Sequence, residues 1–257
     1  MDVAAVERLA RQQEKSDAQR AEAAHRRAIA MSAQQAKWIA SNTLPVSVLA
    51  PIEATGPFVI GTALFIRAWP NAGALRDSNV AAGNNSGEYR LDIDGDILDA
   101  ADEARLSFYA LWQNRQDVDV TVRVASQLNV NAHVSAHADG RRFSSIFIPG
   151  ASADASLRAR LTLTPLWLQN TQFTAAEGFV GSVSARGGFF GDDDDATIFT
   201  SVSLDGSLPV TVPAGRFLML ETSLVTGWKI DAGRIRVDAE QGAFRVDVPF
   251  WIATVLA

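Results

Sequence analysis

Polar and apolar residues alternate with a period of two along most of the chain after about residue 43. The clearest stretch is 117–124, Asp-Val-Asp-Val-Thr-Val-Arg-Val, in which every valine lies on one face. Leu157 to Thr164 and Phe244 to Phe250 repeat this pattern. Successive side chains of a β-strand point to opposite faces, so such a stretch predicts a strand with one apolar and one polar face.

More stretches rich in β-branched and aromatic residues lie between turn-forming Gly, Asn and Asp residues, with no helical pattern between them. They cover residues 46–50, 58–69, 104–112, 129–138, 143–148, 179–185, 196–204, 208–212, 216–226 and 234–238. Strands joined in this way form antiparallel sheets. Ten or more of them favour a mainly β fold, a two-sheet sandwich of jelly-roll type, over a seven-stranded immunoglobulin fold. The polar, Asn- and Gly-rich segment Pro70 to Tyr89 is expected to be a long surface loop.

The first forty residues follow a different pattern. Residues 2–40 contain neither Gly nor Pro, and twelve of the first forty are Ala, which predicts a long N-terminal α-helix. Pro45 and the residue before it end that helix. We therefore expect a helical arm at 1–42 and a β-sandwich domain at 43–257. The apolar stripe of the arm has two interpretations: self-association into a homo-oligomer or with other particle proteins, or packing against its own β domain.

Composition narrows the classes of function. The net charge is −6, with about +2 in residues 1–40 and −8 in the remainder, which argues against nucleic acid as the main partner. The absence of cysteine excludes thiol catalysis and disulfides. The N-terminus has no secretory signal pattern, and the most apolar stretch, 58–69, is too short for a helical membrane span. We expect a protein that is cytoplasmic at synthesis and that can join an assembled particle.

One acidic stretch imitates a calcium-binding loop. Asp92, Asp94, Asp96 and Glu103 occupy the first, third, fifth and twelfth positions of an EF-hand loop, whose oxygen ligands converge on one ion. Ile97 stands where that loop needs Gly for its sharp turn, and the flanking residues have a strand pattern rather than a helical one. The stretch is therefore either a calcium site, with calcium as the only candidate cofactor, or an acidic turn between strands.

Two further groups of polar residues could bind a metal. The run Asp192 to Asp195 consists of carboxylates that repel one another, so they are either splayed into solvent or neutralised by a cation. His133 and His137 lie in a predicted strand, where four residues span about 13 Å, too far for one zinc ion. The histidines are therefore expected at the surface or at a sheet edge.

Three tryptophans near predicted strand ends, Trp69, Trp112 and Trp228, have amide or acidic residues nearby and are candidates for stacking on sugar rings. The alternative is packing in the core. The sequence holds no nucleophile elbow, phosphate loop or dinucleotide motif.

The architecture, an arm followed by a many-stranded sandwich, resembles structural proteins of phages and similar particles, which implies a virion-like component. The leading hypothesis is a non-enzymatic structural or interaction protein that oligomerises through the arm. The alternative is a calcium-assisted carbohydrate-binding module.

Overall fold

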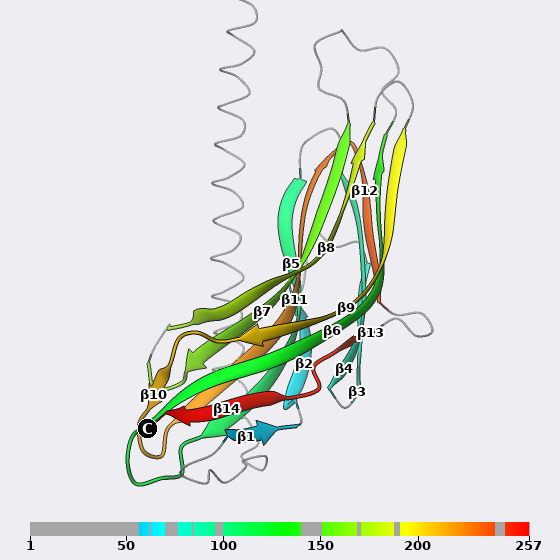
Figure 1. Ribbon diagram of the computed structural model, residues 1–257. Helices are drawn as coiled ribbons and strands as arrows, with labels where there is room; N and C mark the ends of the chain where they lie inside the picture. The colour runs from blue at the N-terminus through cyan, green and yellow to red at the C-terminus, as the bar shows by residue number, and fades with distance from the viewer. Residues whose placement is uncertain are drawn as a thin grey trace, which may run out of the picture.

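The computed structural model describes residues 57–61, 63–69, 77–83, 85–95, 100–139, 151–168, 171–187, 191–239 and 245–256. Within these residues the fold is all-β, with fourteen strands in two antiparallel sheets (Figure 1). Sheet A holds β1 (Pro57–Ile60), β3 (Asp77–Gly83), β4 (Ser86–Gly95), β6 (Val120–Ala138), β9 (Asp192–Asp205), β10 (Val210–Val212), β12 (Gly233–Ala239), β13 (Arg245–Asp247) and β14 (Trp251–Leu256). Sheet B holds β2 (Phe65–Trp69), β5 (Ala100–Gln113), β7 (Ser152–Pro165), β8 (Phe173–Arg186) and β11 (Phe217–Asp231).

The chain crosses between the two sheets several times. Four of the strands of sheet A lie side by side in the order β4-β12-β6-β9, and four of those of sheet B in the order β5-β11-β7-β8. This order is that of two interleaved Greek keys, as in a jelly roll. The side chains between the sheets form one core cluster, in which Trp112, Trp251, Tyr89 and Phe108 are among the largest fully buried residues.

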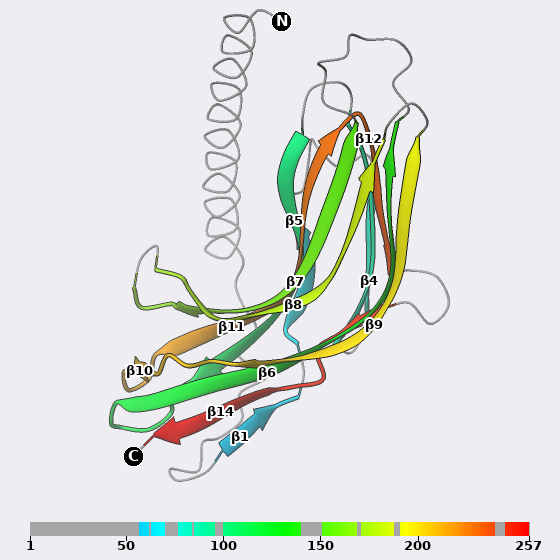
Figure 2. The same cartoon turned by 45° about the horizontal axis from the view of Figure 1, so that its top comes forward.

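Strand β6 organises sheet A. It is 19 residues long and curves along its length (Figures 1 and 2). On one side it pairs in succession with β14, β13 and β12, and on the other side with β10 and β9. Its even-numbered residues are buried, whereas its odd-numbered residues are partly or fully exposed. The stretches 117–124 and 129–138, predicted as separate strands, therefore belong mainly to this one strand.

The expected fold, a sandwich preceded by a long N-terminal helix, is wrong as a description of the structure, because the described residues contain strands and no helix. Residues 1–42, on which the arm prediction rests, lie outside the described residues. The helix was expected from local propensity, which tertiary contacts often override. The boundary at residues 42 and 43 stays a prediction.

The segment Pro70 to Tyr89 is not a continuous loop, because β3 and the first residues of β4 lie in it and pair as a hairpin, with Gly83 opposite Ser86. Asn85 in the turn has a φ of 61°, a left-handed value that Asn tolerates better than most residues. Its side chain accepts a hydrogen bond from the backbone N–H of Ala63 and donates one to the carbonyl of Gly61. Asn85 thereby fixes the link between β1 and β2, which the sequence had suggested were one strand.

Candidate functional site

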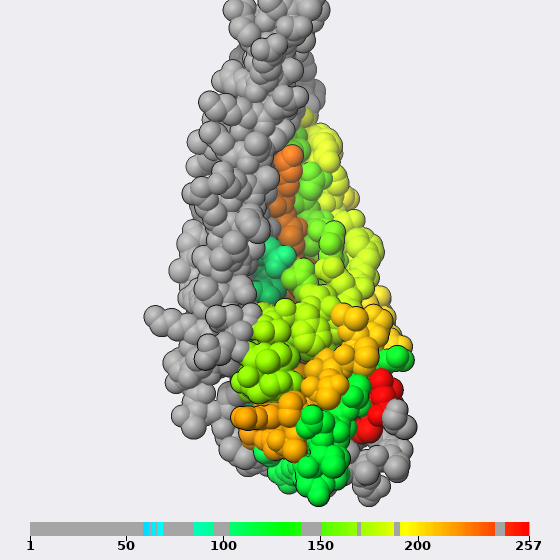
Figure 3. All heavy atoms as spheres, turned by 90° about the vertical axis from the view of Figure 1, so that its left-hand side faces the viewer, coloured from blue at the N-terminus to red at the C-terminus, as the bar shows by residue number. Residues whose placement is uncertain are grey.

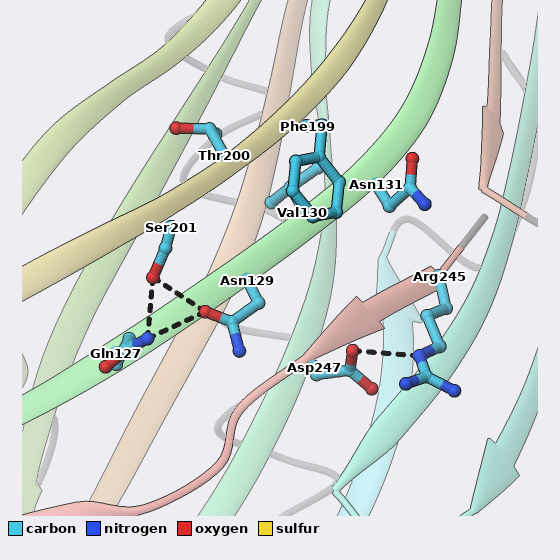
Figure 4. Close-up of a pocket in the computed structure, with 9 residues that line it drawn as sticks. All are labelled: Gln127, Asn129, Val130, Asn131, Phe199, Thr200, Ser201, Arg245 and Asp247. Carbon is cyan, nitrogen blue, oxygen red and sulfur yellow. Dashed lines mark hydrogen bonds and ion pairs between the residues drawn. The ribbon is translucent and has the colours of Figure 1, made fainter. Parts of the chain in front are cut away.

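The outer face of sheet A carries an open hollow of about 610 Å³ where β6, β9 and β13 run side by side (Figure 4). Its lining residues are Gln127, Asn129, Val130 and Asn131 from β6, Phe199, Thr200 and Ser201 from β9, and Arg245 and Asp247 from β13. Most of these side chains are uncharged amides or hydroxyls. We call this set of residues the amide hollow.

The register of the strands arranges these residues in rows across the sheet. Phe199 and Arg245 both pair with Asn131, one from each side. Ser201 and Asp247 flank Asn129 in the same way. Neighbouring strands lie about 4.8 Å apart, and residues two apart on one strand are about 6.8 Å apart. The side chains that line the hollow therefore form a small grid, with an aromatic ring at one edge and a pair of opposite charges at the other.

The amides of the hollow hold one another in place. Gln127 Nε2 donates to Asn129 Oδ1 at 2.8 Å and to Ser201 Oγ at 2.6 Å. Ser201 Oγ donates to the same Asn129 oxygen at 2.7 Å (Figure 4). Two of these three bonds end on Oδ1 of Asn129 and none uses its Nδ2 group, so Nδ2 can donate to a ligand. A polar group that is oriented in advance loses less conformational entropy when it binds.

Phe199 is the most exposed large hydrophobic side chain in the described part of the chain, at 86%. It lies on the same face as Ser201 and the other outward-facing residues of β9. An aromatic ring in this position offers an apolar face beside hydrogen-bonding groups, a combination that suits a ligand with both apolar and polar surface.

The predicted calcium ligands do not converge where they are described. Asp92 on β4 accepts hydrogen bonds from Arg234 on both carboxylate oxygens, at 2.6 Å from Nε, and Asp94 lies 3.4 Å from the same guanidinium. Glu103 belongs to β5 in sheet B and lies 3.4 Å from Arg160.

Asp96, the fourth predicted ligand, lies outside the described residues. Across the described ranges, no group of three His, Asp or Glu side chains is arranged to hold a metal ion. Calcium binding stays a prediction.

Two of the three candidate tryptophans are core residues. Trp112 on β5 is 1% exposed and Trp228 on β11 is 5% exposed, and both belong to the core cluster between the sheets. A buried ring offers no face to a sugar, so the structure removes these two residues from the candidate ligand site. Trp69 is the last residue of β2 and pairs with Arg105, but its side chain is not described. Its role stays a prediction.

The aspartate run forms the beginning of β9, at the seam between the edges of the two sheets. Asp192 accepts a hydrogen bond from the backbone N–H of Arg186 at 2.9 Å, and Asp194 accepts one from the N–H of Ser184 at 2.7 Å. These N–H groups belong to β8, one of the two edge strands of sheet B, which contacts β9 (Figure 3). Strand alternation separates Asp192 and Asp194 from Asp193 and Asp195, and backbone N–H groups stabilise the carboxylates of Asp192 and Asp194 by hydrogen bonds.

His137 lies on the outer face of sheet A, with its side chain 47% exposed. Its Nδ1 is 2.6 Å from Asp193 Oδ1, and its Nε2 is 3.3 Å from Asp139 Oδ1. The hydrogen bond to Asp193 raises the pKa of His137 above its ordinary value of 6.5, with a smaller Coulombic contribution from the two aspartates. His133 shares this face, in agreement with the expected surface positions.

The raised pKa of His137 predicts a pH-dependent stability. Because the folded protein holds the proton more tightly, this stabilisation is complete below pH 6.5 and is lost as the pH rises through the folded pKa. We expect the loss to stay below about 1 kcal/mol, because the pair is exposed and screened. Thermal melts of the wild type and of His137→Gln between about pH 5 and about pH 9 measure this loss. His133→Gln is the control, and an unchanged slope in His137→Gln would contradict the assignment.

No family model matches the chain, and no curated protein matches it. Solved structures give weak likenesses. The carbohydrate-binding module TmCBM61, solved in complex with β-1,4-galactotriose, has 8% identity and a TM-score of 0.23, over 75% of this chain and 90% of that one. The mannan-recognising module TmCBM27 has 11% identity and a TM-score of 0.20, over 72% and 87%. The insecticidal crystal protein Cry2Aa has 10% identity and a TM-score of 0.24, over 74% and 22%. Likenesses with TM-scores this low assign neither a fold family nor a function to this chain.

The described part of the chain contains no helix of the length and apolar character that a membrane crossing requires.

Proposed function

We propose that the protein is a non-catalytic carbohydrate-binding β-sandwich that holds an oligosaccharide in the amide hollow of sheet A. The observation that carries this proposal is the Phe199 ring, 86% exposed, in the same hollow as the oriented amides of Gln127 and Asn129. A sugar ring has an apolar face of C–H groups and a rim of hydroxyls. The first suits an aromatic ring, and the second suits amide and hydroxyl groups, which can both donate and accept hydrogen bonds.

The hollow suits an extended ligand better than an enclosed small molecule. It is open, and its lining residues come from three strands whose outward side chains form a grid. The proposed ligand lies along the strands and is held at several points, each of which contributes modestly. Calcium is not required for this binding mode, because the lining residues supply the contacts directly.

Substitution of Phe199 tests the proposal. Phe199→Ala is expected to weaken oligosaccharide binding about tenfold or more, since it removes the one large apolar contact of the hollow. A glycan array identifies a ligand, and titration calorimetry then measures its Kd for both proteins. Phe179→Ala is the matched control, because Phe179 is also an exposed phenylalanine, at 66%, but lies on β8 outside the hollow. Equal losses in the two variants, or no glycan bound by the wild type, would refute the proposal.

The structural role inferred from the N-terminal arm stays a separate prediction. It depends on residues 1–42, which lie outside the described residues. Both interpretations describe a protein that binds a partner without transforming it. They differ in the surface used, which is the arm in one case and the amide hollow in the other.

A further inference from the structure

The charged residues of the amide hollow form a closed pair. Among the lining residues that the structure describes, Arg245 is the only cation and Asp247 the only anion. Arg245 Nε donates to Asp247 Oδ2 at 3.0 Å, and both residues lie on β13 (Figure 4). The Arg245 side chain is 62% exposed and that of Asp247 26%. The hollow therefore offers a ligand no unbalanced charge.

This pairing changes what Arg245 can recognise. An isolated arginine beside a sugar site favours carboxylate or sulfate groups, because its N–H groups can bind both oxygens of an anion. Here the neighbouring carboxylate of Asp247 occupies the Nε donor and repels a second anion placed nearby. Vicinal hydroxyls have no such conflict, because they can donate to Asp247 and accept from the two terminal nitrogens of Arg245.

No other described lining residue of the hollow carries a positive charge that would compensate for Asp247. The other lining residues are uncharged, and the whole protein carries a net charge of −6, which opposes the approach of a polyanion. We propose that the hollow selects neutral oligosaccharides over acidic ones, and that Asp247 sets this specificity by balancing Arg245. The inference rests on the carbohydrate-binding function proposed above.

Asp247→Asn tests the role directly, because it removes the negative charge and keeps the size of the side chain. Two matched pairs of oligosaccharides serve as probes: β-1,4-mannan with β-1,4-mannuronan, and β-1,4-glucan with β-1,4-glucuronan, each at equal length. Within a pair the sugars differ only in the oxidation state of C6. The wild type is expected to prefer the neutral member of the pair that it binds. Asp247→Asn is expected to bind the acidic member about tenfold more tightly than the wild type does, and to bind the neutral member more weakly, because an amide is a weaker acceptor for a sugar hydroxyl than a carboxylate is.

Asp154→Asn is the matched control. Asp154 accepts a hydrogen bond from Arg186 Nη1 at 2.6 Å, and this pair is similarly exposed, at 35% and 60%, but lies on sheet B. Releasing Arg186 is expected to leave acidic-glycan binding unchanged. Circular dichroism and thermal melts establish that each variant is folded.

The outcomes separate the two proposals. A wild type that binds the acidic member as tightly as the neutral one, or tighter, overturns the neutral specificity and leaves carbohydrate binding intact. That comparison uses the wild type alone, so it tests the neutral specificity even if Asp247→Asn does not fold. A folded Asp247→Asn protein with no gain for the acidic member overturns the role of Asp247. A wild type that binds no glycan overturns both proposals together.

Discussion

Trp251→Ala is expected to lower the free energy of unfolding by about 3–5 kcal/mol, as for other large aromatic residues removed from a core. Trp251 begins β14, is 0% exposed and belongs to the core cluster between the sheets. Its removal leaves a cavity that the surrounding strands cannot close, because each is fixed by pairing on both sides or by the opposite sheet.

The indole of Trp251 also begins a chain of hydrogen bonds across the core. Its Nε1–H donates to Thr222 Oγ1 at 2.8 Å, and Thr222 lies 2.8 Å from Ser126 Oγ. Ser126 in turn can donate to the carbonyl of Phe250 at 3.4 Å. One consistent direction of donation satisfies every group, and it links β11 of sheet B to β6 and β14 of sheet A. Buried polar groups linked in this way fix the relative position of the sheets.

Urea denaturation followed by circular dichroism measures the effect, because tryptophan fluorescence changes with the substitution itself. Thr222→Val, which keeps the shape of the side chain, is expected to cost about 1–3 kcal/mol by leaving the indole N–H unsatisfied. Leu208→Ala is the control, since Leu208 is 51% exposed. A Trp251→Ala loss no larger than that of the control would show that β14 is not part of the cooperative core.

The strand pattern predicts local structure better than it predicts partners. The alternation over Leu157 to Thr164 matches β7. The polarity of a strand's own residues decides which of its side chains face the core. The stretch 58–69 instead divides into β1, which pairs with β14, and β2, which pairs with β5 in the other sheet. Nothing local to that stretch specifies the division, because it depends on Asn85 in a hairpin about twenty residues later.

The same distinction applies to the site. The amide hollow joins segments around residues 127, 199 and 245, so no contiguous motif marks it. The phase of each aromatic residue is nevertheless informative. Trp112 is in phase with the buried residues Leu106 and Phe108, which predicts a core position. Phe199 is in phase with the exposed polar residues of β9, which predicts an exposed ring. Proximity to a strand end, the criterion applied to the tryptophans, does not report which face a side chain occupies.

Glu221→Ala is expected to destabilise the protein by about 3–5 kcal/mol, because it leaves buried donors without their acceptor. Glu221 lies on β11 and is 0% exposed. Its Oε1 accepts hydrogen bonds from Ser107 Oγ at 2.7 Å and from Tyr109 OH at 3.2 Å, and Gln172 Nε2 donates to Oε2 at 3.3 Å. Arg105 Nη1 lies 4.0 Å from Oε1, so a positive charge also loses a counter-charge.

The double substitution Arg105→Met with Glu221→Met separates the value of the ion pair from the cost of breaking it. Replacing both partners by apolar side chains removes the desolvated charges together, so the double variant is expected to be more stable than Glu221→Ala. Glu177→Ala is the exposed control: Glu177 lies 3.2 Å from Arg160 with its side chain 36% exposed, and its loss is expected to cost less than about 1 kcal/mol. Urea denaturation of all three variants measures these differences in the free energy of unfolding.

If Glu221→Ala costs no more than Glu177→Ala, the Glu221 carboxylate is not the acceptor that keeps Ser107 and Tyr109 buried. If the double variant is the least stable of the three, Arg105 stabilises this face by packing its aliphatic stem, and its charge is secondary.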